Sequence, residues 1–192
     1  MYDAVPDPYC YPGTTVLKNL ANIRDQTALD EFEEAMTALR AEEALPRGRL
    51  GVPHYKAIHQ HLFQDVYAWA GQYRIVRIAK DGSAFCYPEN IDREMRRLFG
   101  ALKEDLFLTG RSREAFAADA AGFLSALNAI HPFREGNGRT QMSFLSLLAA
   151  SAGHPLDLEN LEPEVFLAAM VASFKGDDTP LERQLLHLVS WK

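Results

Sequence analysis

The sequence predicts a mainly α-helical bundle that carries one β-hairpin, and three observations lead to this fold class. Several segments repeat apolar residues at intervals of three and four, which gives a helix one buried face. One segment alternates apolar and polar residues beside an Asp-Gly pair, which is typical of a hairpin turn. Hydrophobic residues make up 47% of the 192 positions, enough for one core. We therefore expect a single domain over residues 1–192, with an N-terminal arm of about residues 1–14.

The N-terminal part combines an extended arm with the first helix. Residues 1–13 hold three prolines and three tyrosines, a composition that predicts an extended arm packed on the body through its tyrosines. A helix is expected in two pieces, 15–20 and 27–45, and it ends at Pro46. One buried stripe is predicted along the second piece, formed by Leu29, Phe32, Met36 and Leu39.

The middle of the chain places the hairpin between two helices. Residues 53–69 predict a helix that is apolar on one side. The alternation over 73–78 predicts a strand, Asp81-Gly82 predicts the turn, and 84–87 is the expected return strand. A further helix is expected from Pro88 to Phe107.

The C-terminal part is predicted to be wholly helical. The segment 113–130 has one apolar face, formed by Phe116, Phe123, Leu127 and Ile130. Pro132 breaks this helix after His131, because proline cannot continue it. Further helices are expected over 139–152, 162–174 and 181–189.

Composition narrows the functional class. The net charge of −6 and the pI near 5.5 argue against direct nucleic-acid binding, which needs a basic face to neutralise phosphates. Cys10 and Cys86 are too few for a disulfide framework, so we expect two free thiols. No secretory leader and no bilayer-spanning stretch is evident, so we expect no membrane association and a cytoplasmic location.

One short segment between two predicted helices gathers groups that suit phosphate chemistry. It is the run His131-Pro132-Phe133-Arg134-Glu135-Gly136-Asn137-Gly138-Arg139. Gly136, Asn137 and Gly138 tolerate left-handed backbone angles, in which successive N–H groups form an anion-binding nest. The helix that starts near Arg139 adds unpaired N–H groups, a positive dipole end and a guanidinium that matches phosphate oxygens.

Two further groups in this segment supply what a transfer reaction needs. Glu135 is a hard oxygen ligand, and Mg²⁺ is usually held by one or two carboxylates together with substrate phosphates. His131 titrates near neutral pH and can accept a proton from an attacking hydroxyl. Each of these residues alone is more often structural, but their joint occurrence within nine residues predicts phosphoryl or nucleotidyl transfer.

The same segment resembles the signature of the Fic family, His-x-Phe-x-(Asp/Glu)-Gly-Asn-Gly-Arg-x-x-Arg. Residues 53–71 resemble the helix that precedes the family's hairpin, and residues 7–19 resemble bacterial Fic toxins and the Fic domains of secreted bacterial effectors. The resemblance implies a Fic-type helical bundle whose hairpin is the family's target-aligning flap. The flap residues that match are Ile78, Lys80 and Phe85.

The resemblance further implies a protein adenylyltransferase, which transfers AMP from its substrate ATP to a Ser, Thr or Tyr hydroxyl of a target protein. His131 would be the general base, and Glu135 would bind Mg²⁺. Ile78, Lys80 and Phe85 would dock the target. The implied nucleotide-binding loop consists of Phe133 as its core anchor, Gly136, Asn137, Gly138 and Arg139.

The match to the signature fails at one position, because Met142 stands where the signature has its second arginine. In the family that arginine holds the γ-phosphate, and a methionine cannot do so. Two alternatives therefore stay open. The same fold could transfer a phosphoryl, UMP, GMP or phosphocholine group, or the chain could be a catalytically impaired interaction module.

The inhibitory helix of the family has the pattern (Ser/Thr)-x-x-x-Glu-(Gly/Asn), and this chain lacks it. Only Thr27 has a glutamate four residues later, and that residue, Glu31, is followed by Phe32. The resemblance therefore favours a separate small antitoxin that supplies an inhibitory helix in trans. The location that it implies is the bacterial cytoplasm, with secretion into a host cell as the alternative.

Overall fold

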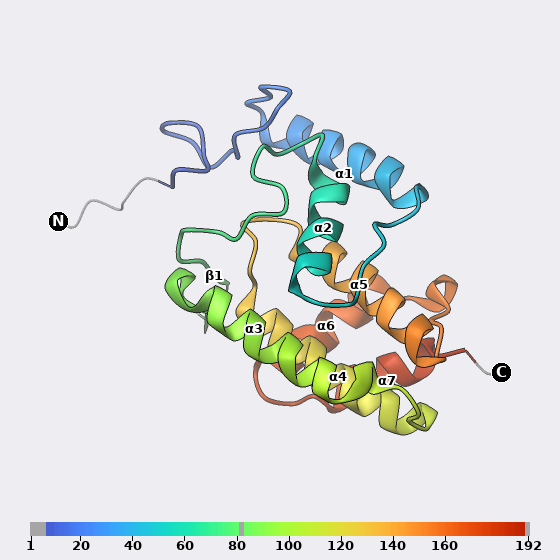
Figure 1. Cartoon of the computed structure of the whole chain (residues 1–192). Helices are drawn as coiled ribbons and strands as arrows, with labels where there is room; N and C mark the ends of the chain where they lie inside the picture. The colour runs from blue at the N-terminus through green and yellow to red at the C-terminus, as the bar shows by residue number, and fades with distance from the viewer. Residues whose placement is uncertain (1–6, 81–82, 191–192) are drawn as a thin grey trace.

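The computed structural model describes residues 7–80 and 83–190, and it confirms a mainly helical fold with one small hairpin (Figure 1). The helices are α1 (Gln26–Glu42), α2 (Val52–Phe63), α3 (Pro88–Glu104), α4 (Arg113–Ile130), α5 (Asn137–Ala152), α6 (Pro163–Phe174) and α7 (Thr179–Leu188). Two 3₁₀ turns, η1 (Leu106–Leu108) and η2 (Leu158–Asn160), lie between helices. The hairpin strands are β1 (Ala79–Lys80) and β2 (Ser83–Ala84).

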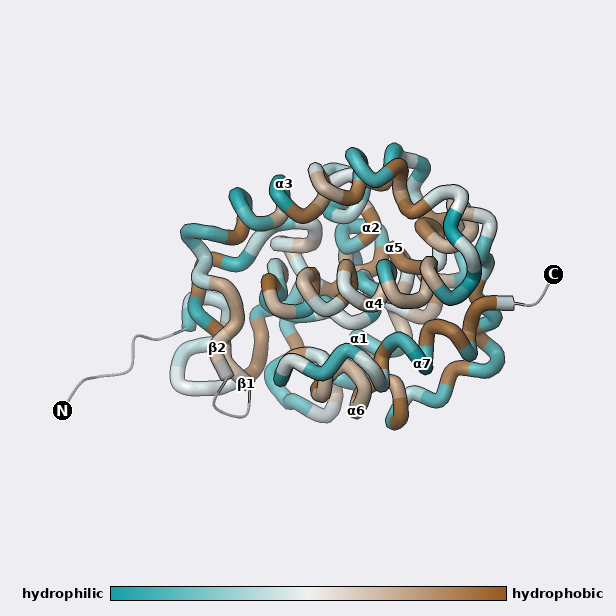
Figure 2. The backbone as a smooth tube through the Cα atoms, turned by 90° about the horizontal axis from the view of Figure 1, so that it is seen from below, coloured by the Kyte–Doolittle hydropathy of each residue, from teal (hydrophilic) through white to brown (hydrophobic). Residues whose placement is uncertain are grey.

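Helix α4 lies at the centre of the bundle. It contacts α3, α5, α6 and α7, and Figure 2 shows it running between α3 on one side and the α6–α7 pair on the other. Ser112 starts this helix by accepting a hydrogen bond from the Ala115 N–H. The predicted bounds 113–130 are confirmed, and the apolar face is buried as expected at Phe116, Phe123, Leu127 and Ile130.

Helix α1 packs on α2, and the predicted stripe is confirmed in part, because Phe32 and Met36 pack against the core. Leu29 is buried, but Leu39 is 57% exposed, so the predicted stripe is wrong at its C-terminal end. The face turned toward the body carries Leu29, Glu33 and Thr37, which follow one another at intervals of one turn. Polar contacts explain why these residues face the body, because Glu33 and Thr37 both bind the side chain of Arg139.

The predicted helix over residues 15–20 is wrong. This segment is not helical, and it pairs with the N-terminal arm through a bridge between Cys10 and Leu17. Two backbone bonds flank the bridge, from the Tyr11 N–H to the Val16 carbonyl and from the Lys18 N–H to the Tyr9 carbonyl. A helix this short has too few internal bonds to persist alone, whereas pairing with the arm satisfies these groups.

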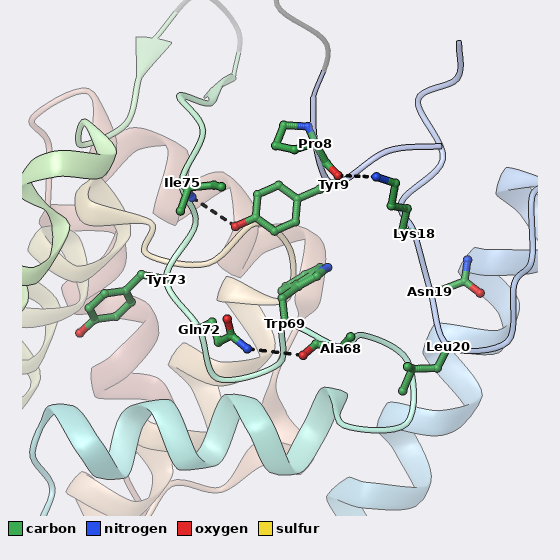
Figure 3. A pocket seen from close by; sticks show the side chains of 10 residues that line it. All are labelled: Pro8, Tyr9, Lys18, Asn19, Leu20, Ala68, Trp69, Gln72, Tyr73 and Ile75. Atoms are coloured by element: carbon green, nitrogen blue, oxygen red, sulfur yellow. Dashed lines mark hydrogen bonds between the residues drawn. The ribbon is translucent and has the colours of Figure 1, made fainter. Parts of the chain in front are cut away.

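The N-terminal arm packs on the body through Tyr9, as predicted. The Tyr9 ring meets the Trp69 ring edge-on with 5.5 Å between centroids, and its hydroxyl accepts a hydrogen bond from the Ile75 N–H (Figure 3). Asp7 adds an ion pair with Arg134 at 2.9 Å. A pocket of about 430 Å³ lies beside the arm, and the predicted phosphate-binding segment does not line it. The arm's first six residues lie outside the described part of the chain.

Helix α2 ends at Phe63, earlier than the predicted end at Trp69. Trp69 instead stacks on Tyr67 with 4.3 Å between ring centroids. Gly71 then adopts a φ of +76°, and its N–H donates to the ring of His59 in α2. The segment after α2 therefore folds back as a loop that packs against this helix. The loop gives the ring of the buried His59 a hydrogen-bond partner.

The hairpin is shorter than predicted, and its first strand, β1, follows the segment 73–78 that was predicted as the strand. β1 and β2 pair antiparallel. The segment 73–78, predicted as a strand, binds the chain just after α4 instead, through the Arg74 N–H. The return strand predicted over 84–87 is also mostly outside the hairpin, because the Cys86 N–H donates to a carbonyl in the last turn of α4. The predicted turn residues Asp81 and Gly82 lie outside the described residues.

The remaining helices are confirmed in type, with ends that shift. α3 stops at Glu104 rather than Phe107, because the 3₁₀ turn η1 follows it. Cys10 and Cys86 are both free thiols, as predicted. Within residues 7–80 and 83–190, no helix combines the length and the apolar character needed to cross a bilayer.

Candidate functional site

His131 ends α4 in a left-handed conformation, with φ 48° and ψ 63°. Pro132 prevents the helix from continuing, while the His131 N–H still donates to the Leu127 carbonyl at 3.1 Å. The half-buried imidazole stacks on the Phe85 ring, with 4.0 Å between the centroids. The predicted base and one predicted flap residue are thus in contact.

The loop after His131 is held by the side chain of Asn137. Its Oδ1 accepts a hydrogen bond from the Phe133 N–H at 3.0 Å, and its Nδ2 donates to the Phe133 carbonyl at 2.9 Å. Phe133 is fully buried and stacks on His59 with 3.7 Å between ring centroids. Phe133 therefore anchors the loop in the core, and its ring is not exposed to a nucleotide.

Gly136 forms the turn into α5 with a φ of +79°. A Cβ atom at this position would lie 2.2 Å from the ring of Phe63, which is itself fully buried and cannot move away. Glycine is required here for both reasons, the backbone angle and the close approach.

The predicted anion nest has a different backbone from the one expected. Among Gly136, Asn137 and Gly138 only Gly136 is left-handed, because α5 begins at Asn137 rather than near Arg139. The first intrahelical bond runs from the Thr140 N–H to the Gly136 carbonyl. The N–H groups of residues 137–139 therefore have no acceptor within the helix and lie at the positive end of its dipole. A phosphate group can accept hydrogen bonds from such donors.

Glu135 fits the predicted role of a magnesium ligand. Its side chain is 44% exposed, and Oε1 accepts a hydrogen bond from the Gly136 N–H at 2.8 Å. Oε1 also lies 3.8 Å from Nη2 of Arg139. Among the residues that the structure describes, no three His, Cys, Asp or Glu side chains form a closed metal site. One carboxylate suits Mg²⁺ when substrate phosphates supply the other ligands.

Arg139 is bound by α1, a contact that was not predicted from the sequence. Its Nη2 forms an ion pair with Glu33, and its Nη1 donates to the Thr37 hydroxyl at 3.1 Å. The guanidinium also lies over the Phe63 ring, 4.7 Å from the centroid. Glu33 in turn accepts a hydrogen bond from the Tyr67 hydroxyl. These contacts hold the guanidinium near the start of α5, and 40% of the side chain stays exposed for a ligand.

His59 is a second residue whose role was not predicted from the sequence. Its Nδ1 accepts a hydrogen bond from the Gly71 N–H at 2.8 Å, so its Nε2 carries the proton and donates to the Glu135 carbonyl at 3.0 Å. Burial lowers the pKa of His59 to about 4, and this outweighs the hydrogen bond to Glu135, which raises it. The only signal in the sequence is spacing, which places His59 on the buried face of α2 with Tyr55.

The buried His59 is expected to make folding stability depend on pH. Its pKa is lower in the folded chain than in the unfolded chain, so only the unfolded chain takes up this proton between about pH 6.5 and 4. The free energy of unfolding should therefore fall as pH drops through this window, by on the order of 3 kcal/mol from this group. Urea titrations at a series of pH values measure the slope.

The matched comparison for this effect is His59→Phe against His187→Phe, which changes an exposed histidine on α7. His59→Phe should flatten the dependence of stability on pH within the window, whatever its effect on the absolute stability. His187→Phe should retain the wild-type slope. Equal slopes in both variants would contradict the role given to His59.

The predicted flap residues differ in their contacts with the site. Phe85 lies between two rings, stacked on His131 and 5.1 Å from Phe174 of α6. The Ile78 carbonyl accepts the Phe85 N–H, so Ile78 lies at the base of the hairpin. Lys80 is the second residue of β1.

Met142 lies three residues after Arg139 on α5, so the two positions share a side of the helix. Its side chain is half-buried and packs against the hydrophobic core. The position that carries an arginine in the family signature therefore presents no cation here.

Known proteins are similar to this chain over most of its length. A family model described as Fic/DOC family matches residues 49–149. The probable protein adenylyltransferase y4lH of Sinorhizobium fredii is 56% identical over 189 residues, covering 98% of each chain. The probable protein adenylyltransferase Fic of Escherichia coli is 38% identical and covers 96% of this chain and 92% of its own.

Solved structures share the fold as well. The BepC protein of Bartonella tribocorum, a translocated effector with bound AMPPNP, superposes with a TM-score of 0.84 at 27% identity, covering 96% of this chain and 97% of that one. The N-terminal Fic domain of a putative cell filamentation protein from Bartonella quintana, with bound ADP, gives a TM-score of 0.82 at 31% identity, covering 95% and 94%.

Proposed function

This chain belongs to the Fic/DOC family, and from that premise we propose that it is a protein adenylyltransferase, which transfers AMP from ATP to a hydroxyl of a target protein. One observation carries the proposal. The loop between α4 and α5 holds His131, Glu135 and the N-terminus of α5 together through buried contacts. The names of the relatives and the AMPPNP bound to BepC support the choice of nucleotide.

In the proposed reaction His131 is the general base. Its imidazole accepts the proton of the target hydroxyl while that oxygen attacks the α-phosphorus of ATP. The new P–O bond joins the target to AMP, the bond to the β-phosphate oxygen breaks, and pyrophosphate leaves. The N–H groups at the start of α5 and the guanidinium of Arg139 bind phosphate oxygens. Glu135 would hold Mg²⁺, which when bound neutralises charge on the phosphates.

Mass spectrometry of a modified target protein tests this proposal. The chain is incubated with ATP and Mg²⁺ and a bacterial lysate, and proteins with an added mass on Ser, Thr or Tyr are sequenced. An AMP adduct that requires both the chain and ATP supports the proposal. Phosphoryl, UMP, GMP and phosphocholine adducts each add a different mass, so the same spectra identify a different donor. The absence of every adduct, while a related adenylyltransferase labels its own target in parallel, would reject it.

The hairpin is proposed to dock the target as an added strand. An exposed strand edge binds an extended partner through main-chain hydrogen bonds, and such binding tolerates varied sequences. Phe85→Ala and Lys80→Ala should therefore raise the KM for the target protein and leave the Kd for ATP unchanged. Steady-state transfer at varied target concentration measures the first quantity, and nucleotide titration measures the second.

Phe107→Ala is the matched control for the flap variants. Phe107 is another half-buried phenylalanine, and it lies beyond the far end of α3 from the hairpin. This control should keep the wild-type KM for the target. An unchanged KM in both Phe85→Ala and Lys80→Ala, with the fold intact, would remove the docking role.

Inhibition and location belong to the same proposal. A separate small antitoxin supplies the inhibitory helix, because the chain's own sequence lacks that pattern. The place of action is the bacterial cytoplasm, or a host cell after secretion. The likeness to BepC, described as a translocated Bartonella effector, supports the second location.

A further inference from the structure

Arg74 is a buried arginine whose guanidinium donates to four main-chain carbonyls. The residue as a whole is 2% exposed. Nε donates to the His131 carbonyl at 2.8 Å, and Nη2 donates to the Ile130 carbonyl at 3.2 Å. Nη1 donates to the Val76 carbonyl at 2.6 Å, and Nη2 also donates to the Cys86 carbonyl at 2.5 Å.

These four acceptors come from two places that the proposed reaction must bring together. Ile130 and His131 form the end of α4, which carries the base. Val76 and Cys86 lie on the two sides of the hairpin, one before β1 and one after β2. One planar group therefore connects the turn at His131 to both ends of the flap.

Main-chain bonds join the same parts from both sides. The Arg74 N–H donates to the Pro132 carbonyl at 2.9 Å, and the Cys86 N–H donates to the Ala129 carbonyl at 3.1 Å. The guanidinium binds the carbonyls of Ile130 and His131, which lie between Ala129 and Pro132 in the chain. Without it, two carbonyls at the end of α4 and two at the base of the flap would lose a buried donor, which is costly.

The end of α4 explains why a cation is suited to this position. The last carbonyls of a helix have no partner within the helix, and they carry the negative end of its dipole. Among the residues that the structure describes, Arg74 has no carboxylate within ion-pair distance, and the carbonyls are its hydrogen-bond partners. A buried charge without this compensation is unfavourable.

We propose that Arg74 is a positioning residue that holds the His131 turn in register with the flap, so that a hydroxyl on a docked target meets the imidazole. The inference rests on the proposed function, since it assigns the flap to the target. It adds that the flap and the base form one unit. This unit depends on the planar guanidinium, which another cation such as an ammonium cannot fully replace.

The test compares Arg74→Met and Arg74→Lys with Arg113→Met in the full chain. Arg113 lies at the opposite end of α4 and likewise donates to two main-chain carbonyls, those of Leu186 and Val189. Arg74→Met should lower kcat for transfer by about a hundredfold, the loss expected from misplacing a reacting group by about 1 Å. Arg113→Met should keep kcat near wild type. Equal kcat in the two variants would overturn the proposal.

Two further measurements separate positioning from general damage. The Kd for ATP should stay unchanged in Arg74→Met, because the start of α5 and Arg139 do not depend on these bonds. Arg74→Lys should recover only part of kcat, since an ammonium cannot reach all four carbonyls in one plane. A parallel loss of ATP binding, or full recovery by lysine, would contradict the assigned role. If Arg74→Met does not fold, the lysine variant carries the same comparison.

NMR of the His131 ring tests the inference without any transfer reaction. The ring resonances should shift and broaden in Arg74→Lys and Arg74→Met and stay unchanged in Arg113→Met. This result depends only on the contact between Arg74 and the His131 turn. Unchanged ring resonances would refute the positioning role, whereas a wild-type chain that transfers no nucleotide would refute the proposed function alone.

Discussion

Replacing His131 with alanine is expected to lower the rate of AMP transfer by on the order of a hundredfold or more, the factor that a general base contributes. The physical reason is local, because no other imidazole contacts the flap ring of Phe85 among the described residues. Single-turnover transfer of labelled ATP to the target measures the rate.

The same change should leave the fold and nucleotide binding intact. The loop is held by Phe133 and Asn137, and His131 contributes its main chain to the α4 end regardless of its side chain. Thermal unfolding and the Kd for ATP should therefore match the wild type. His187→Ala, which removes an exposed histidine on α7, serves as the control and should transfer AMP at the wild-type rate. Near-normal transfer by His131→Ala would exclude it as the base.

Introducing an arginine at Met142 is expected to tighten ATP binding and to raise AMP transfer. The guanidinium of Arg139 is already shared with Glu33 and Thr37, so a triphosphate finds few cations near the start of α5. A hydrogen bond to a charged group contributes about 1.5 to 3 kcal/mol, which corresponds to roughly a tenfold to hundredfold decrease in Kd. Nucleotide titration by calorimetry measures the change directly.

Met142→Leu is the matched control, because it keeps an apolar side chain of similar size against the core. It should bind ATP as the wild type does. Reduced AMP transfer by Met142→Arg, together with efficient transfer from another donor by the wild type, would show that Met142 is adapted to that donor. The choice of AMP would then be wrong, although the reaction class would stand.

The arginine variant also tests the proposed inhibition in trans. A cation at position 142 offers a partner to an inhibitory glutamate. A peptide with the family's inhibitory pattern should therefore inhibit Met142→Arg more strongly than the wild type. Equal inhibition of both would mean that any antitoxin acts on another part of the chain.

Local sequence patterns were sufficient for the bounds of α4 and for the place of the loop that follows it. The bounds of α4 follow from its apolar period and the proline after His131, both of which act within a few residues. The segment that resembles the family signature is local too, because His131, Glu135 and the N–H donors lie on one turn and the start of one helix. Such features depend on neighbours along the chain, so they can be predicted from the sequence.

The tertiary structure decided the features that depend on partners far along the chain. Arg139 binds Glu33, which precedes it by 106 residues, and this pair turns a polar residue of α1 toward the body while Leu39 of the predicted apolar stripe is exposed. The segment around Arg74 bonds to the end of α4 rather than forming the predicted strand, which shortens the hairpin. His59 is a core histidine whose two hydrogen bonds exist only after α2 meets the loops at Gly71 and Glu135. In each case a buried polar group must find a partner, and only the folded chain determines which group that is.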